Sequence, residues 1–276
     1  MRKFLLLISA MLVMTGMMAQ DIYAVGHYTP SGSSQKHAAV WKNGSSTPLY
    51  NSAASSSDNT STAVVVNPNT GDVYWSRCNG SYGDVMKNGS VFLNQSSGTY
   101  IRDIFWYGSS DGNLRSAGYR TSGNKKYAAV WVGSNATAAY SPDYDNGKES
   151  EAYGVVAIKT PNNASLTYFC GYLNNTESGS PRAVIWKGGT GVYYTLSNNN
   201  SCALAMTYYN GNFYTVGYDI EGGVTKLKVW QNSNVLYTLV DSNASQRADI
   251  YVDAGDVYVV AYGGTRSEER RVGKEC

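Results

Sequence analysis

Short apolar runs that end at a tight turn recur along the chain and set its pattern of hydrophobic and polar positions. The first copy, residues 38–44, reads AAVWKNG. Related copies, one of them with Met86 in place of tryptophan, occupy residues 83–89, 128–133, 183–189 and 227–232. An Asn-Gly pair favours a two-residue hairpin turn, because both central positions of a type I′ turn need a positive φ. Each copy therefore predicts a strand, a tight turn and a second strand.

Two further apolar elements precede each hairpin. The nearer one is rich in β-branched and aromatic residues, as expected for a strand, and carries a Gly-Tyr pair in three of its six copies. Its copies are residues 22–28, 73–78, 114–119, 167–172, 213–218 and 257–262. A glycine inside a strand marks a close approach by another group. Here we expect an aromatic ring from a neighbouring sheet to lie over it.

The earlier element is a second strand, separated from the first by residues that favour turns. Its copies are residues 63–66, 101–106, 152–156, 203–206 and 248–252. The strands after the hairpin turns are residues 48–50, 91–93, 136–140, 192–196 and 235–239. The repeating unit is therefore four antiparallel strands.

The spacing of the hairpins predicts how these units assemble. Their anchor residues are Trp41, Met86, Trp131, Trp186 and Trp230, at intervals of 45, 45, 55 and 44 residues. Four strands per roughly 45 residues is the period of a β-propeller blade. We predict an all-β propeller of four-stranded antiparallel blades, incomplete here and with six or more blades in the intact protein. The first unit lacks its first strand, and the last unit lacks its last two.

The two ends of the chain differ in composition from the rest. Residues 1–19 have a basic start, a short apolar run and a small residue before Gln20, which is typical of a secretory signal peptide. Residues 266–276 are highly charged and resemble the translation of a sequencing-adapter oligonucleotide. We predict a signal peptide at 1–19, an incomplete propeller at 20–265 and a non-native tail at 266–276 of a truncated gene. The signal peptide predicts that the protein is exported to the periplasm, the cell surface or the medium.

Removing these ends changes the charge and the cysteine count. Of 22 basic and 20 acidic residues, the leader holds two basic ones and the tail four basic and three acidic, so 16 and 17 remain. A nearly neutral domain gives no reason to expect nucleic acid or an anionic membrane as partner. Cys78, Cys170 and Cys202 remain, without zinc-site spacing, and we expect buried free thiols.

The repeats resemble those of secreted bacterial propellers of the Tyr-x-x-Gly-Tyr and Val-Trp-Lys-Asn-Gly type. The resemblance covers Asp21 to about Gly264. Similarity to kelch and WD-repeat propellers is more distant, because the double-glycine and Trp-Asp signatures are missing. Propellers serve both binding and catalysis, so the resemblance implies a fold and an exported protein but no particular activity.

Three carboxylates are the candidates for chemistry in the channel of the propeller. Asp103 and Asp249 share one position of the first strand of their units, which lines the channel, and Glu151 begins another such strand. Carboxylates about 5–10 Å apart serve glycoside hydrolysis. A cation or a polar ligand is an alternative. A purely structural role is another, with each aspartate bonded to backbone or to Arg102 or Arg247.

Metal binding has a weaker basis. The loop 143–151 places Asp143, Asp145 and Glu149 at alternating positions, which suits calcium, although Lys148 interrupts it and the EF-hand pattern fails. The only histidines, His27 and His37, flank one loop. No other cofactor is indicated.

These observations predict a non-enzymatic exported module that binds a glycan or a protein through its loop face. The motivation is that catalytic motifs are missing while the loops are long and polar. The alternatives are an enzyme that acts on polysaccharide through the channel carboxylates, and a structural repeat module of a larger exported protein. The sequence does not indicate an oligomeric state, and no segment after the leader is apolar enough to enter a membrane.

Overall fold

The described part of the chain consists of antiparallel sheets. The computed structural model describes residues 21–52, 58–79, 82–95, 97–142, 147–161, 164–174, 179–240, 244–263 and 266–272, so the predicted signal peptide lies outside the described residues. Six sheets follow one another along the chain. Sheet 1 holds β1 (Tyr23–Tyr28), β2 (His37–Lys42) and β3 (Tyr50–Asn51). Sheet 2 holds β4 (Val64–Val66), β5 (Val73–Cys78), β6 (Gly83–Lys87) and β7 (Ser90–Leu93).

The next four sheets repeat this order. Sheet 3 holds β8 (Thr99–Trp106), β9 (Leu114–Ser122) and β10 (Lys125–Val132), with the short 3₁₀ helix η1 (Asp111–Asn113) before β9. Sheet 4 holds β11 (Ser150–Lys159), β12 (Ser165–Asn174), β13 (Pro181–Lys187) and β14 (Gly191–Thr195). Sheet 5 holds β15 (Ser201–Tyr209), β16 (Asn212–Glu221), β17 (Val224–Gln231) and β18 (Asn234–Val240). Sheet 6 holds β19 (Ala244–Asp253), β20 (Asp256–Gly263) and β21 (Arg266–Val272).

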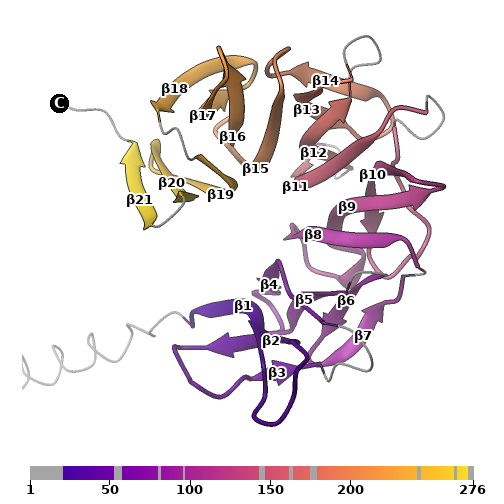
Figure 1. The fold of residues 1–276 in the computed structure, drawn as a ribbon. Coiled ribbons are helices and arrows are strands. Elements are labelled where there is room, and N and C mark those ends of the chain that lie inside the picture. Colours follow the sequence, from indigo (N-terminus) through magenta and orange to yellow (C-terminus); the bar gives the residue numbers. More distant parts are fainter. Residues whose placement is uncertain are drawn as a thin grey trace, which may run out of the picture.

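The six sheets lie along an arc whose inner side carries the first strand of each unit (Figure 1). These inner strands are β4, β8, β11, β15 and β19. The predicted order of four strands is confirmed in sheets 2, 4 and 5. In sheet 3 the expected strand at 136–140 is reduced to a single bridge between Val130 and Tyr140. Sheet 6 gains a third strand from residues 266–272, whose non-native origin stays a prediction.

The hairpin turns follow the chemistry of their residues. Asn43 and Gly44 both have positive φ, at 53° and 70°, as do Asn88 and Gly89, at 49° and 85°. The asparagine has a second role that the turn rule does not predict. The side-chain oxygen of Asn88 accepts a hydrogen bond from the backbone N–H of Val73, 2.9 Å away, at the start of β5. Equivalent bonds link Asn43 to Ile22 and Asn232 to Phe213, so this asparagine ties the second and third strands together.

Three of the hairpin tryptophans pack between neighbouring sheets. Trp186 is fully buried with Val130 of sheet 3, and its ring stacks on Phe169 at 5.2 Å. Trp230 occupies the same place between sheets 4 and 5, and Trp131 between sheets 2 and 3. Each of these three tryptophans therefore covers the face of the sheet before it.

Gly118, Gly171 and Gly217 in the second strands of sheets 3, 4 and 5 meet backbone, and the expectation of a covering aromatic ring is wrong for these three. A Cβ on Gly171 would lie 1.9 Å from the carbonyl oxygen of Glu151 on the inner strand of its own sheet. Gly118 and Gly217 show the same approach, at 1.8 Å from Tyr100 and 2.1 Å from Cys202. Each glycine faces a point where the register of the inner strand slips by one residue. The glycine thus makes room for a β-bulge.

The buried thiols agree with the sequence prediction. Cys78, Cys170 and Cys202 are free and buried. Burial raises the pKa of Cys78 to about 12, so its thiol stays protonated. Over the ranges that the structure describes, no helix has the length and apolar character needed to cross a membrane.

Candidate functional site: a central cavity

A cavity of about 450 Å³ opens where the six sheets converge. Five of the six sheets contribute to its lining, together with the segment 60–62 that leads into β4 of sheet 2, although these residues are far apart in the sequence. The lining residues are His27, Thr60, Ser61, Thr62, Tyr100, Arg102, Tyr153, Leu204, Arg247 and Ala248. A volume of this order is typical of small-ligand sites.

The β-bulges of the inner strands determine which side chains reach the cavity. The register slips at Arg102 in β8, at Tyr153 in β11 and at Leu204 in β15, and all three residues line the cavity. A bulge inserts one unpaired residue and redirects its side chain. The same backbone device thus presents a cation, an aromatic ring and an aliphatic chain to one space.

Arg102 is held by a buried carboxylate from the next sheet. Its Nε lies 2.6 Å and its Nη2 2.5 Å from Oε1 of Glu151, whose residue is 1% exposed. Lys126 approaches the other oxygen of Glu151 at 3.3 Å. Burial tends to lower the pKa of Arg102, but Glu151 and the neighbouring tyrosines raise it overall, so the guanidinium stays charged.

Tyrosine rings enclose the same guanidinium. The central carbon of Arg102 lies 4.5 Å from the ring centre of Tyr100, 5.0 Å from that of Tyr153 and 5.9 Å from that of Tyr119. Tyr100 and Tyr119 are themselves stacked at 5.7 Å. Cation–π contacts of this kind stabilise and orient a guanidinium. Burial raises the pKa of the Tyr153 hydroxyl, so it remains a hydrogen-bond donor.

The three predicted channel carboxylates lie beside the cavity, and none belongs to its lining. Glu151 is the buried partner of Arg102, as described above. Asp103 accepts hydrogen bonds from the backbone N–H of Ile104 at 2.8 Å and of Val155, in the next sheet, at 2.9 Å. Asp249 is exposed and accepts only the N–H of Ile250 among the described residues.

Asp103 and Asp249 are nevertheless close enough to interact. Burial raises the pKa of Asp103 to about 7, the two backbone donors oppose this rise, and the charge of Asp249 adds to it. The sequence placed these residues at one repeat position three units apart, and the structure brings them into electrostatic range.

The candidate metal sites receive no support from the described residues. Asp143 and Asp145 lie outside them, so the calcium prediction is untested there, while Glu149 accepts a 3.3 Å hydrogen bond from the side chain of Asn174. In sheet 1, His27 pairs with Ala38 and Tyr28 with His37. The two histidines therefore point to opposite faces of the sheet, which prevents them from sharing an ion.

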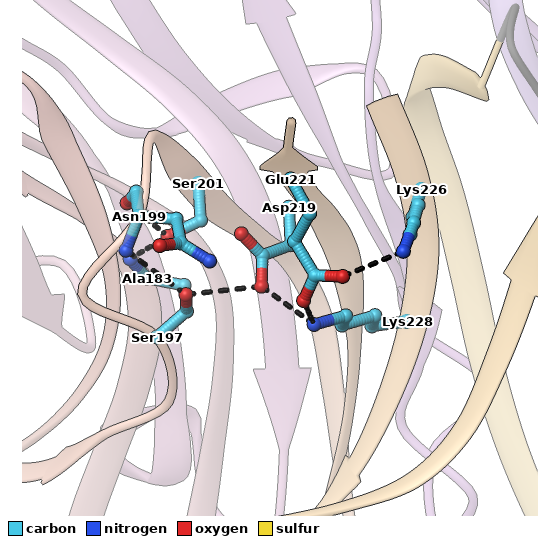
Figure 2. Close-up of polar contacts among 8 residues, drawn as sticks. All are labelled: Ala183, Ser197, Asn199, Ser201, Asp219, Glu221, Lys226 and Lys228. Carbon is cyan, nitrogen blue, oxygen red and sulfur yellow. Dashed lines mark hydrogen bonds and ion pairs between the residues drawn. The ribbon is translucent and has the colours of Figure 1, made fainter. Parts of the chain in front are cut away.

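A second polar cluster, away from the cavity, links β16 and β17 of sheet 5 to the segment between β14 and β15 (Figure 2). Lys228, 6% exposed, donates to Asp219 at 2.7 Å and to Glu221, and Ser197 also donates to Asp219 at 3.0 Å. Lys226 holds the other oxygen of Glu221 at 2.6 Å. Hydrogen bonds from the two lysines lower the pKa of Glu221 to about 2. The charged groups of this cluster are bonded mainly to one another, which indicates a structural role.

The sequence prediction missed the lining residues Tyr100 and Tyr153 and regarded Arg102 only as a partner for an aspartate. One feature of the sequence could have indicated these residues, namely the repeat position directly before that of Asp103. It differs in every unit, being threonine, arginine, tyrosine and leucine at positions 62, 102, 153 and 204. A position that varies inside a regular repeat is a candidate for specificity.

No protein-family model and no curated protein sequence matches the chain. A solved structure similar to it is that of an α-L-arabinofuranosidase from Clostridium thermocellum, at 14% sequence identity and a TM-score of 0.38. The alignment covers 75% of this chain and 82% of that one. A similarity at this level carries no argument about the activity or the residue roles of this chain.

Proposed function

We propose that the six sheets are blades of a β-propeller, with six or more blades in the intact protein, and that the chain is an exported, non-enzymatic module that binds a glycan in the central cavity. The observation that supports this proposal is the cavity of about 450 Å³, which is lined by residues of five sheets and by the segment leading into sheet 2. Its lining combines hydroxyl groups, tyrosine rings and an oriented guanidinium, which is chemistry suited to sugars.

Binding is favoured over catalysis because two of the three carboxylates beside the cavity, Glu151 and Asp103, already have both oxygens engaged. Glu151 is held by Arg102 and Lys126, and both oxygens of Asp103 accept backbone N–H groups. A general acid or a nucleophile needs an oxygen that can reach the reacting atom.

A glycan array followed by calorimetry tests the proposal. We expect the full chain to bind at least one glycan, and Tyr153→Ala to weaken that binding by about tenfold or more because it removes a wall of the cavity. Tyr193→Ala is the matched control, since this tyrosine is 43% exposed on β14 and lies outside the cavity lining. An empty array would contradict glycan binding, and capture of a specific protein by a pull-down would then favour a protein ligand.

The enzyme that acts on polysaccharide remains a second candidate because of one observation. Asp103 has a pKa of about 7 and lies in electrostatic range of Asp249, as a proton-donating carboxyl beside a carboxylate would require. Polysaccharide hydrolysis that is abolished in the double variant Asp103→Ala, Asp249→Ala would support this candidate. Hydrolysis that is unchanged in a folded double variant would eliminate it.

A further inference from the structure

Arg102 presents hydrogen-bond donors to the central cavity that no described residue uses. A guanidinium has five N–H donors. Glu151 takes the donors of Nε and one of Nη2, and the side chain of Arg102 remains 28% exposed at the cavity. No other hydrogen bond from Arg102 to a described residue is present, which leaves one edge of the planar group available to a ligand.

We propose that the glycan bound in the central cavity is an acidic sugar, whose carboxylate pairs with this outer edge of Arg102. The inference rests on the proposed function and specifies its ligand. A planar carboxylate matches the fork of a guanidinium with two parallel hydrogen bonds, a geometry that a neutral hydroxyl group does not reproduce.

The arginine is fixed before any ligand arrives. Glu151 anchors one edge from a buried position, while Tyr100 and Tyr153 hold the plane of the group at 4.5 and 5.0 Å. Ordering a long side chain on binding costs conformational entropy. Because this ordering is already achieved, more of the pairing energy contributes to affinity.

The charge around the cavity favours the same ligand. The lining includes Arg102, Arg247 and His27 and no acidic side chain among the described residues. Glu151 carries one negative charge against the two positive charges of Arg102 and Lys126, so this three-residue cluster keeps a net positive charge. Next to these cations, the hydroxyl-bearing segment 60–62 offers hydrogen-bonding groups for the ring hydroxyls of a sugar. Electrostatic complementarity of this kind gives specificity.

Titration calorimetry with a matched pair of sugars tests this inference. The probes are trigalacturonic acid and the neutral galactotriose, at one low salt concentration, with the full chain and with the variants Arg102→Gln and Arg102→Lys. Arg77→Gln is the control, because Arg77 pairs with a buried aspartate, Asp84, and lies 5.6 Å from a tyrosine ring, outside the cavity lining.

We expect the unaltered protein to bind the acidic sugar at least tenfold more tightly than the neutral one. This ratio should fall towards one in Arg102→Gln and should stay unchanged in Arg77→Gln. If Arg102→Gln does not fold, the same affinity ratio measured with Arg102→Lys tests the inference, because lysine keeps the positive charge and lacks the planar fork. Equal binding of both sugars by the unaltered protein would overturn the inference and leave the proposed function in place. Failure to bind any sugar would overturn both.

Discussion

Two positions that recur in every unit behave in opposite ways, and the comparison separates architecture from function. The hairpin anchor is nearly constant, with Met86, Trp131, Trp186 and Trp230 all buried between sheets. The bulge position of the inner strand changes from unit to unit and faces the central cavity. A position that must fill the same space between successive sheets largely keeps its residue. A position that surrounds one asymmetric ligand has no reason to do so.

The largest effect is expected from a substitution at the nearly constant hairpin position. Trp186→Ala removes a fully buried ring that packs against sheet 3, and a loss of about 3–5 kcal/mol in the free energy of unfolding is expected. Trp41→Ala is the matched change at the same repeat position, where the ring is only half-buried. Its loss should be clearly smaller. Urea unfolding of both variants measures the difference, and equal losses would contradict the role of the anchor in packing between sheets.

The second prediction concerns the glycines that make the bulges possible. Gly171→Ala places a Cβ against the carbonyl oxygen of Glu151, and the backbone cannot easily move there, so we expect a loss of roughly 1–3 kcal/mol. Because Glu151 holds Arg102, ligand binding should weaken as well. Gly26→Ala is the control, since its Cβ would meet only the ring of Trp41 at 3.7 Å. Similar unfolding curves for the two variants would refute this account of the glycines.

The features that could be predicted from the sequence are those that depend on residues close together in the chain. Strands, turns and sheet order depend on neighbours in sequence, such as Asn43 and Gly44, and were predicted. The pairing of Arg102 with Glu151 joins two sheets, and the approach of Asp103 to Asp249 spans the arc, so no local pattern contains them. The bulge lies between these extremes. Its glycine was noticed in the sequence, but an aromatic ring was expected where backbone lies.

The third prediction concerns the pH dependence of folding stability and Asp103, the residue that follows the bulge in β8. The pKa of Asp103 is raised in the folded state to about 7 from an ordinary value of 3.8, so the folded state holds this proton more tightly than the unfolded one. The stability contribution of this group is therefore fully present below about pH 4 and is lost as the pH rises to about 7.

The variant Asp249→Asn tests the cause of this pH dependence. It removes a charge that raises the pKa of Asp103, so the loss of stability should end at a lower pH than in the unaltered protein. Thermal unfolding measured from pH 4 to pH 8 reports the pH range over which this stability is lost. A stability that rises over this range, or an unchanged window in the variant, would contradict the proximity of the two aspartates.

The smallest expected effect is at the varied position itself. Tyr153→Phe keeps the ring that faces Arg102 at 5.0 Å and removes a hydroxyl that makes no hydrogen bond to any described residue. The free energy of unfolding should therefore change by less than about 0.5 kcal/mol, as for a substitution outside the packed core. A loss above about 1 kcal/mol would mean that the bulge residue is part of the architecture after all. If stability is kept while glycan affinity falls, the hydroxyl contributes to ligand recognition, because the ring and its contact with the guanidinium are the same in both proteins.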